Sequence, residues 1–159
     1  MLFSGGADPA ALGSASGAST STVYIGQGDN ASGGAFATPV ILTGEQAALA
    51  VTVPAGGCVT SFSATWVTSA LPTGSVSGKV YAALLADSNN NGVFDLLPGG
   101  LLPLNGTVTA STPVGTVLYG SSRPRGILTA GSRVIVAFYM VDSSASASLL
   151  GYGTAAIGV

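Results

Sequence analysis

The sequence predicts an all-β fold, and three observations carry this prediction. Runs rich in β-branched and aromatic residues recur along the chain, and turn residues separate them about every 8–12 residues. The segment Val59–Val67 alternates with a period of two, which is the period of a strand. A helix needs about ten residues with few Gly or Pro, and only Thr43–Leu49 comes near this. About eight to ten short strands with this spacing predict a sandwich or a barrel.

The first third of the chain divides into a lead-in and the start of the folded domain. Residues 1–21 are dominated by Gly, Ala, Ser and Thr, which predicts a flexible linker, and residues 22–159 then form the domain. The first expected strands are Thr22–Gly26, Phe36–Leu42 and Ala47–Val53.

The expected strand Val59–Val67 has two chemically different sides. Phe62 and Trp66 fall on one side, and Ser61 and Ser63 fall on the other. This pattern is typical of a strand with one face in the core and one face outside it.

The second half of the chain continues the strand pattern. Asn and Gly tolerate positive φ, so Asn105-Gly106 and the Asn-rich segment before Gly92 are expected turns. Val76–Ala86 is an expected strand, and Thr107–Tyr119, interrupted by Pro and Gly, predicts two strand segments or one bulged edge strand. The last expected strands are Arg133–Val141, whose apolar content predicts burial on both faces, and Leu149–Val159.

Charge is unusually scarce in this chain. Charged residues make up 6% of it, against about 25% in an average soluble domain, while hydrophobic residues make up 47%. Gly, Pro, Ser, Thr or Asn interrupts every apolar stretch before it reaches about 18 residues, so no membrane insertion is expected. Net charge keeps copies of a protein apart, so a net charge of −2 favours self-association.

Composition also disfavours a nucleic-acid partner and an intrachain disulfide. Four basic residues are too few to displace the counterions of a nucleic acid, so no nucleic-acid partner is expected. Cys58 is the single cysteine, which excludes an intrachain disulfide. We expect it to be a small buried hydrophobe, with intermolecular pairing as the alternative.

The chain lacks the usual equipment of an enzyme. It has no His, which removes the commonest general base and metal ligand, and it has no Gly-x-Ser-x-Gly elbow. The spacing of its six acidic residues selects no catalytic pair. The sequence therefore predicts a non-enzymatic protein with no catalytic residues and no required cofactor.

One segment has part of the sequence pattern of a calcium-binding loop. Asp87, Asn89 and Asn91 match an Asp-x-Asn-x-Asn-Gly pattern, and Asp95 adds a carboxylate at the ninth position of the loop. Ca²⁺ takes six to eight oxygen ligands. Pro98 stands where the bidentate Glu of the full pattern would be. These four residues are the candidate metal ligands, and Ca²⁺ is the candidate ion. The favoured alternative is a hairpin loop whose Asn and Asp side chains cap their own backbone.

Two aromatic pairs are candidates for stacking on a ligand. They are Phe62 with Trp66, and Phe138 with Tyr139. Such aromatics more often belong to a core or a subunit interface, and we favour that interpretation.

Several segments, taken in order, resemble one family. Val53–Phe62 looks like an apolar-Pro-x-x-Gly-x-Ile-Thr-Ser opening of a strand, and Leu128–Phe138 is similar to Thr-Ala-x-Thr-Arg followed by an apolar run. Gly151–Val159 resembles a Gly-Tyr, small-residue, Gly-apolar terminus, and Phe3–Gly5 resembles a Phe-Ala-Ser-Gly start. Together they resemble the C-terminal domain of BclB-type collagen-like exosporium glycoproteins of spore-forming bacteria.

This resemblance implies a trimerising head on a collagen-like stalk, displayed on the spore surface. It also implies an antiparallel β-sandwich, a jelly roll of the C1q/TNF kind. No Gly-x-y repeat is present in the sequence. The leading expectation is a structural homotrimer on the exosporium, with other spore-surface proteins or host surface ligands as further partners. The alternative is a trimeric adhesin that recognises glycan or protein through its loops.

Overall fold

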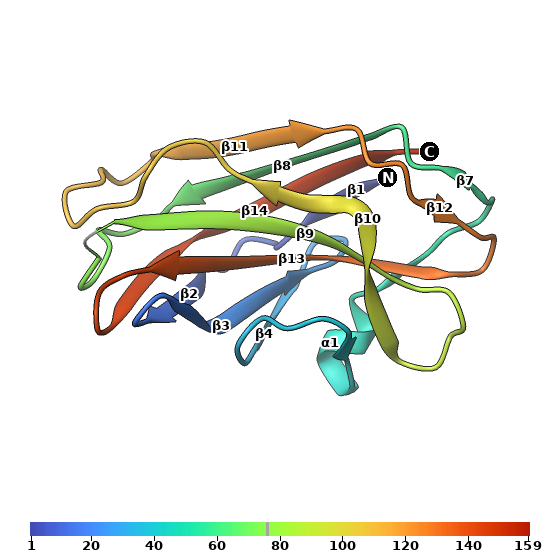
Figure 1. The fold of residues 1–159 in the computed structure, drawn as a ribbon, viewed down its shortest axis with the longest axis horizontal. Coiled ribbons are helices and arrows are strands. Elements are labelled where there is room, and N and C mark those ends of the chain that lie inside the picture. The colour runs from blue at the N-terminus through green and yellow to red at the C-terminus, as the bar shows by residue number, and fades with distance from the viewer. Residues whose placement is uncertain (76) are drawn as a thin grey trace.

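The computed structural model, which describes residues 1–75 and 77–159, is built mainly from one hydrogen-bonded sheet folded into two facing β-layers (Figure 1). One layer has the order β11 (Val117–Ser122), β8 (Ser61–Thr68), β14 (Ala147–Gly158) and β2 (Ala10–Ala15), with β1 (Leu2–Ser4) paired to β14. The other has the order β3 (Ala18–Ile25), β13 (Arg133–Asp142), β9 (Gly78–Asp87), β10 (Val93–Pro103) and β5 (Val40–Ile41). The short elements are β4 (Asn30–Gly33), α1 (Gly44–Ala48), β6 (Val51–Thr52), β7 (Gly57–Cys58) and β12 (Ile127–Leu128).

The connectivity of the long strands is that of a jelly roll. The chain passes from one layer to the other between β2 and β3, β6 and β8, β8 and β9, β10 and β11, β11 and β13, and β13 and β14. As a result β14 lies between β8 and β2, and β13 lies between β9 and β3 (Figure 1). All of these strand pairs are antiparallel. The predicted antiparallel β-sandwich of jelly-roll type is therefore confirmed.

The main core fills the space between the two layers. Phe62, Ala64 and Trp66 point inward from β8, as the alternation of that segment predicts, and Trp66 meets Phe138 of β13 with ring centroids 5.3 Å apart. Residues 134–138 are all buried because β13 is covered on both sides, which confirms the prediction for this strand.

A second, smaller core covers the outer side of β9 and β13. Ala83, Leu85, Ile135 and Ala137 belong to it, and the connection that carries β5 and α1 packs over them. Much of this connection was predicted as strand, but only β5 and β6 form within it. Its apolar residues reflect this packing on the sheet. Among the described residues, no helix is long and apolar enough to cross a membrane.

The amino-terminal segment differs from the prediction. Where a flexible lead-in is expected over residues 1–21, the structure has β1, β2 and the first part of β3. Ala10, Leu12 and Ser14 of β2 are buried in alternation, and Phe3 of β1 is 2% exposed. The side chains of β2 are small because the strand lies against the hydroxyls of β3, where a Cβ on Gly13 would meet Thr20 Oγ1 at 2.6 Å. Small residues therefore indicate close packing here and not a linker.

Two other expectations need correction. Cys58 is exposed, because the two-residue strand β7 pairs with β12 outside the main sheets. The strand β10 was not predicted, since Pro98 and Gly99 interrupt it, and the structure accommodates them where the pairing register with β9 shifts between Leu96 and Leu101. Val76, where the sequence predicts a strand to begin, lies outside the described residues.

A candidate assembly face on one sheet

The outer side of the layer that contains β14 presents a continuous surface, here called the uncharged face. It consists of the outward side chains of β1, β14, β8 and β11. The pairing register sets them in rows across the strands: Leu2, Ala156, Ser63 and Ser121; Ser4, Thr154, Thr65 and Tyr119; Tyr152, Val67 and Val117. This arrangement follows from the period of two, because the alternate residues of the same strands point into the core.

None of the chain's ten charged residues belongs to the four strands of this face. The charges lie on the other layer, on loops and on α1, and Arg123 follows directly after β11. The face is also partly apolar, since Leu2 is 74% exposed, Tyr119 58% and Val117 51%. Sheet faces that meet water usually carry polar or charged side chains. A charge-free face with exposed apolar residues is instead typical of a protein interface.

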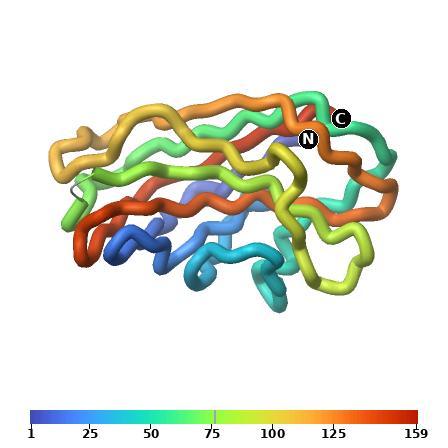
Figure 2. The backbone as a smooth tube through the Cα atoms, in the orientation of Figure 1, coloured from blue at the N-terminus to red at the C-terminus, as the bar shows by residue number. Residues whose placement is uncertain are grey.

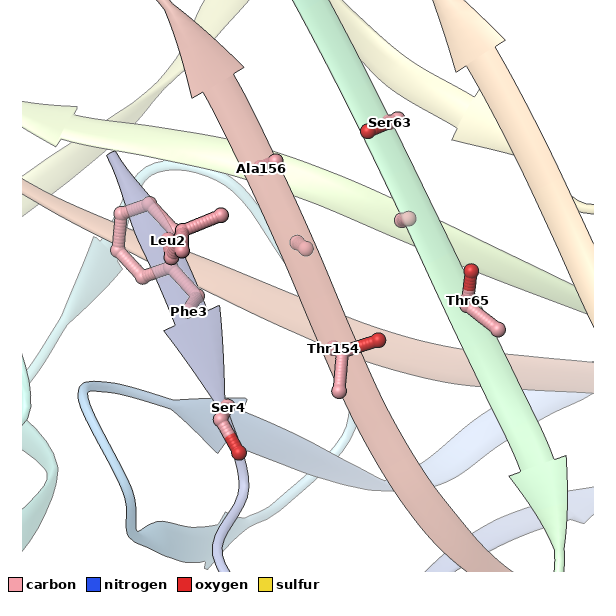
Figure 3. A pocket seen from close by; sticks show the side chains of 9 residues that line it. Leu2, Phe3, Ser4, Ser63, Thr65, Thr154 and Ala156 are labelled. Atoms are coloured by element: carbon pink, nitrogen blue, oxygen red, sulfur yellow. The ribbon is translucent and has the colours of Figure 1, made fainter.

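Small side chains make a shallow hollow in the middle of the uncharged face (Figure 3). Ser63 and Thr65 of β8 and Thr154 and Ala156 of β14 line it, with Leu2 at its edge. Figure 3 shows these short side chains along two neighbouring strands. The hollow is lined mostly by carbon, with hydroxyls as its polar groups, so it suits an apolar or aromatic side chain.

The predicted calcium loop forms the hairpin between β9 and β10, and Asp87 organises it. Asp87 Oδ1 accepts hydrogen bonds from the backbone N–H of Asn89 and Asn91, and Oδ2 accepts one from the N–H of Gly92 at 2.9 Å. Arg133 Nη2 lies 2.8 Å from Oδ2 and forms an ion pair with it. This is the self-capped hairpin of the alternative interpretation.

The remaining candidate ligands lie at the surface of the hairpin. Asn89, Asn91 and Asp95 are exposed, and Asn91 Oδ1 accepts a hydrogen bond from the N–H of Val93. Among the described residues, no group of three or more His, Cys, Asp or Glu side chains is placed to hold a metal ion. A cation at Asp87 would also have to compete with the guanidinium of Arg133.

The electrostatics of the hairpin follow from these contacts. Burial raises the pKa of Asp87, but the hydrogen bonds from Arg133, Gly92 and Asn91 outweigh it and hold the pKa below its ordinary value of 3.8. The Arg133 guanidinium also lies over the Phe94 ring, 5.4 Å from its centroid. Asp87 therefore stays ionised and fixes the hairpin to β13.

The candidate stacking aromatics are used inside the fold. Phe62, Trp66 and Phe138 are fully buried in the main core, in agreement with the favoured interpretation. Tyr139 is half-buried on the outer side of the other layer, stacked on Phe36 at 4.2 Å and on Tyr81 at 5.2 Å. Tyr139 is therefore already stacked on two rings of the same chain.

The uncharged face was not predicted, although part of its signal is visible in the sequence. The alternation of hydroxyl and aromatic residues in β8 identifies its outer side. What local patterns do not show is that β1, β11 and β14 lie beside β8, since these strands come from distant parts of the chain.

Comparisons with known proteins add little to these observations. No protein-family model matches the chain, and no curated protein matches it. Among solved structures, the chain is similar to the Eiger TNF of S. frugiperda, with 10% sequence identity and a TM-score of 0.46. That match covers 99% of this chain and 90% of the other. A similarity of this size carries no information about function.

Proposed function

We propose that this chain is a structural, non-catalytic head that assembles into a homotrimer through its uncharged face. The observation that carries the proposal is the absence of charge from the four strands of that face, together with its exposed apolar residues. Burying such a surface removes apolar area from water without desolvating an ion. A second copy of the same chain suits it, because neither copy repels the other there.

The proposed assembly is a ring and not a two-fold dimer. A cyclic trimer needs two different patches that fit each other, whereas a two-fold dimer needs one self-complementary patch. Exposed apolar side chains also occur outside the uncharged face, with Leu101 42%, Val114 59% and Ile127 68% exposed. One of these side chains would occupy the hollow between Thr65 and Thr154 in a neighbouring copy.

The finer proposal is that this trimer is the head of a collagen-like filament on the bacterial spore surface. It rests on the resemblance of the sequence motifs to BclB-type exosporium domains. The position of the two ends is compatible with it: the Ile157 N–H donates to the Met1 carbonyl at 2.9 Å, so residues 1 and 157 lie together (Figure 2). Since Leu2 is already on the uncharged face, three amino-terminal stalks would leave the trimer close to one another.

Light scattering coupled to size exclusion tests the assembly. We expect the wild-type protein to be a trimer at micromolar concentration and Thr154→Asp to be a monomer. Each carboxylate buried without a partner costs about 3–5 kcal/mol. Thr52→Asp is the matched control, because Thr52 is exposed on β6, outside the uncharged face, and we expect it to remain trimeric.

Two results would contradict the proposal. A monomeric wild-type protein at micromolar concentration would show that the chain does not form the proposed trimer. A Thr154→Asp variant that stays trimeric, with unchanged circular dichroism, would show that the uncharged face is not the interface.

A further inference from the structure

The chain contains two Asn-Gly turns that share the backbone φ of their glycine and a hydrogen bond to the asparagine side chain. They are Asn91-Gly92 and Asn105-Gly106, and both glycines have φ of +83°. Both asparagines are exposed, and each Oδ1 accepts a backbone N–H, from Val93 at 3.0 Å and from Tyr119 at 2.8 Å respectively. The pair therefore forms a controlled comparison within one molecule.

Asn-Gly sequences can modify themselves without an enzyme. The glycine nitrogen loses its proton and attacks the asparagine Cγ, so a new C–N bond closes a five-membered succinimide and the side-chain nitrogen leaves as ammonia. Water then opens the ring and gives aspartate or isoaspartate. Glycine favours this because it has no Cβ to hinder the attacking nitrogen. An N–H that donates to the asparagine Oδ1 polarises the carbonyl under attack, and both turns have one.

The two turns differ at the attacking nitrogen. The N–H of Gly92 donates to the buried, ionised carboxylate of Asp87 at 2.9 Å. To react, this nitrogen must give up a charge-assisted hydrogen bond and lose a proton beside an anion, and both are unfavourable. Among the described residues, the N–H of Gly106 has no acceptor. It is exposed to water and base.

We propose that the Asn105-Gly106 turn is a site of spontaneous deamidation, and that Asp87 protects the Asn91-Gly92 turn from the same reaction. Deamidation at Asn105 would affect the uncharged face, because Asn105 is hydrogen-bonded to a residue of that face. Its backbone N–H donates to the Tyr119 carbonyl at 2.8 Å, and its Oδ1 accepts the Tyr119 N–H, so it is bound to both backbone groups of a residue on the uncharged face. Deamidation places a carboxylate at the margin of a face that has no charge.

This consequence, which rests on the proposed function, is a gradual weakening of the trimer as the protein ages. Isoaspartate lengthens the backbone by one carbon at a residue that pairs twice with β11. Aspartate keeps the pairing and adds one negative charge per copy, which repels the equivalent charges in an assembly.

Peptide mapping by mass spectrometry tests the site assignment. The folded protein is incubated at mildly alkaline pH, digested, and scored for replacement of an amide by a carboxyl at each asparagine. We expect Asn91 to convert at least about tenfold more slowly than Asn105, the factor expected when a hydrogen bond to a charged group must first break. The same incubation in denaturant is the control, and there both turns are expected to convert at similar rates. Conversion of Asn91 in the folded protein as fast as Asn105, or faster, would overturn the proposal.

The consequence is tested separately by light scattering of Asn105→Asp, with Asn105→Gln as the uncharged control. We expect Asn105→Asp to dissociate at a higher concentration than Asn105→Gln. Equal dissociation of the two variants would overturn the effect on assembly. A monomeric wild-type protein would overturn the proposed function. The deamidation site would then still be tested by the peptide map alone.

Discussion

Replacing Asp87 by Asn separates the two interpretations of the β9–β10 hairpin. The carboxylate accepts four hydrogen bonds, two at each oxygen, from three backbone N–H groups and Arg133. An amide keeps one oxygen and turns a donor toward the other two donors, so two of the four bonds are lost. At about 1.5–3 kcal/mol for each hydrogen bond to a charged group, the variant loses about 3–6 kcal/mol of stability.

Thermal and urea unfolding measure this loss. A loss of 3 kcal/mol lowers the melting temperature of a domain of this size by at least about 6 °C. Asp95→Asn is the matched control, because Asp95 is exposed in the same hairpin and is expected to change stability by no more than about 0.5 kcal/mol. Calcium and chelator are expected to leave the wild-type melting temperature unchanged.

The pH dependence of stability gives a second readout for Asp87. Because its folded pKa is lowered, its contribution is fully present above its ordinary pKa of 3.8 and is lost as pH falls from there through the folded pKa. Asp87→Asn removes this part of the acid limb. A cost of Asp87→Asn below about 1 kcal/mol would contradict the role of Asp87 in holding the hairpin. The self-capped interpretation is refuted if chelation destabilises the wild-type protein and Asp95→Asn abolishes that effect.

Three further predictions concern the sandwich itself. Leu12→Ala, in the segment that resembles a linker, is expected to cost about 2–5 kcal/mol in urea unfolding, and a cost near zero would mean that β2 does not contribute to the core. Gly151→Ala places a Cβ 2.4 Å from Trp66 Nε1 and is expected to destabilise by about 1–3 kcal/mol, whereas Gly34→Ala, with open space around it, is expected to be neutral or mildly stabilising. Burial and then the charge of a neighbouring tyrosine raise the pKa of Tyr139 to about 12. The contribution of Tyr139 to stability is therefore fully present below pH 10.0 and is expected to be lost as pH rises from there to about 12. Tyr139→Phe is expected to remove this part of the loss in urea unfolding at alkaline pH.

The fold class followed from local patterns because each strand records its own environment. Phe62 and Trp66 alternate with hydroxyl residues, and this alternation is a direct consequence of the two-sided geometry of β8. In Arg133–Asp142 the apolar residues do not alternate, because β13 has a core on each side. The turn at Asn105-Gly106 was also predictable, since it needs a positive φ that Gly106 adopts.

The same local patterns misled where packing, and not residue type, sets the conformation. The Ala, Gly and Ser of β2 resemble a linker, but their small size lets β2 lie close to the hydroxyls of β3. Cysteine is typically a buried residue type, yet Cys58 is exposed because its strand lies outside the main sheets. At Asp87 the sequence left a calcium ligand and a self-capping residue open, with the second favoured, and the folded hairpin shows Arg133 and three N–H groups bonded to the carboxylate.

The sequence by itself determined that the chain is all β, that it is poor in charge and that its strands have distinct inner and outer sides. Tertiary structure alone decided which outer sides share a surface. Strand pairing joins residues that are far apart in the chain, such as Leu2 with Ala156 and Ser63 with Ser121, and no local period encodes those partners. The uncharged face exists because the jelly-roll connectivity brings four charge-free strands together in one layer.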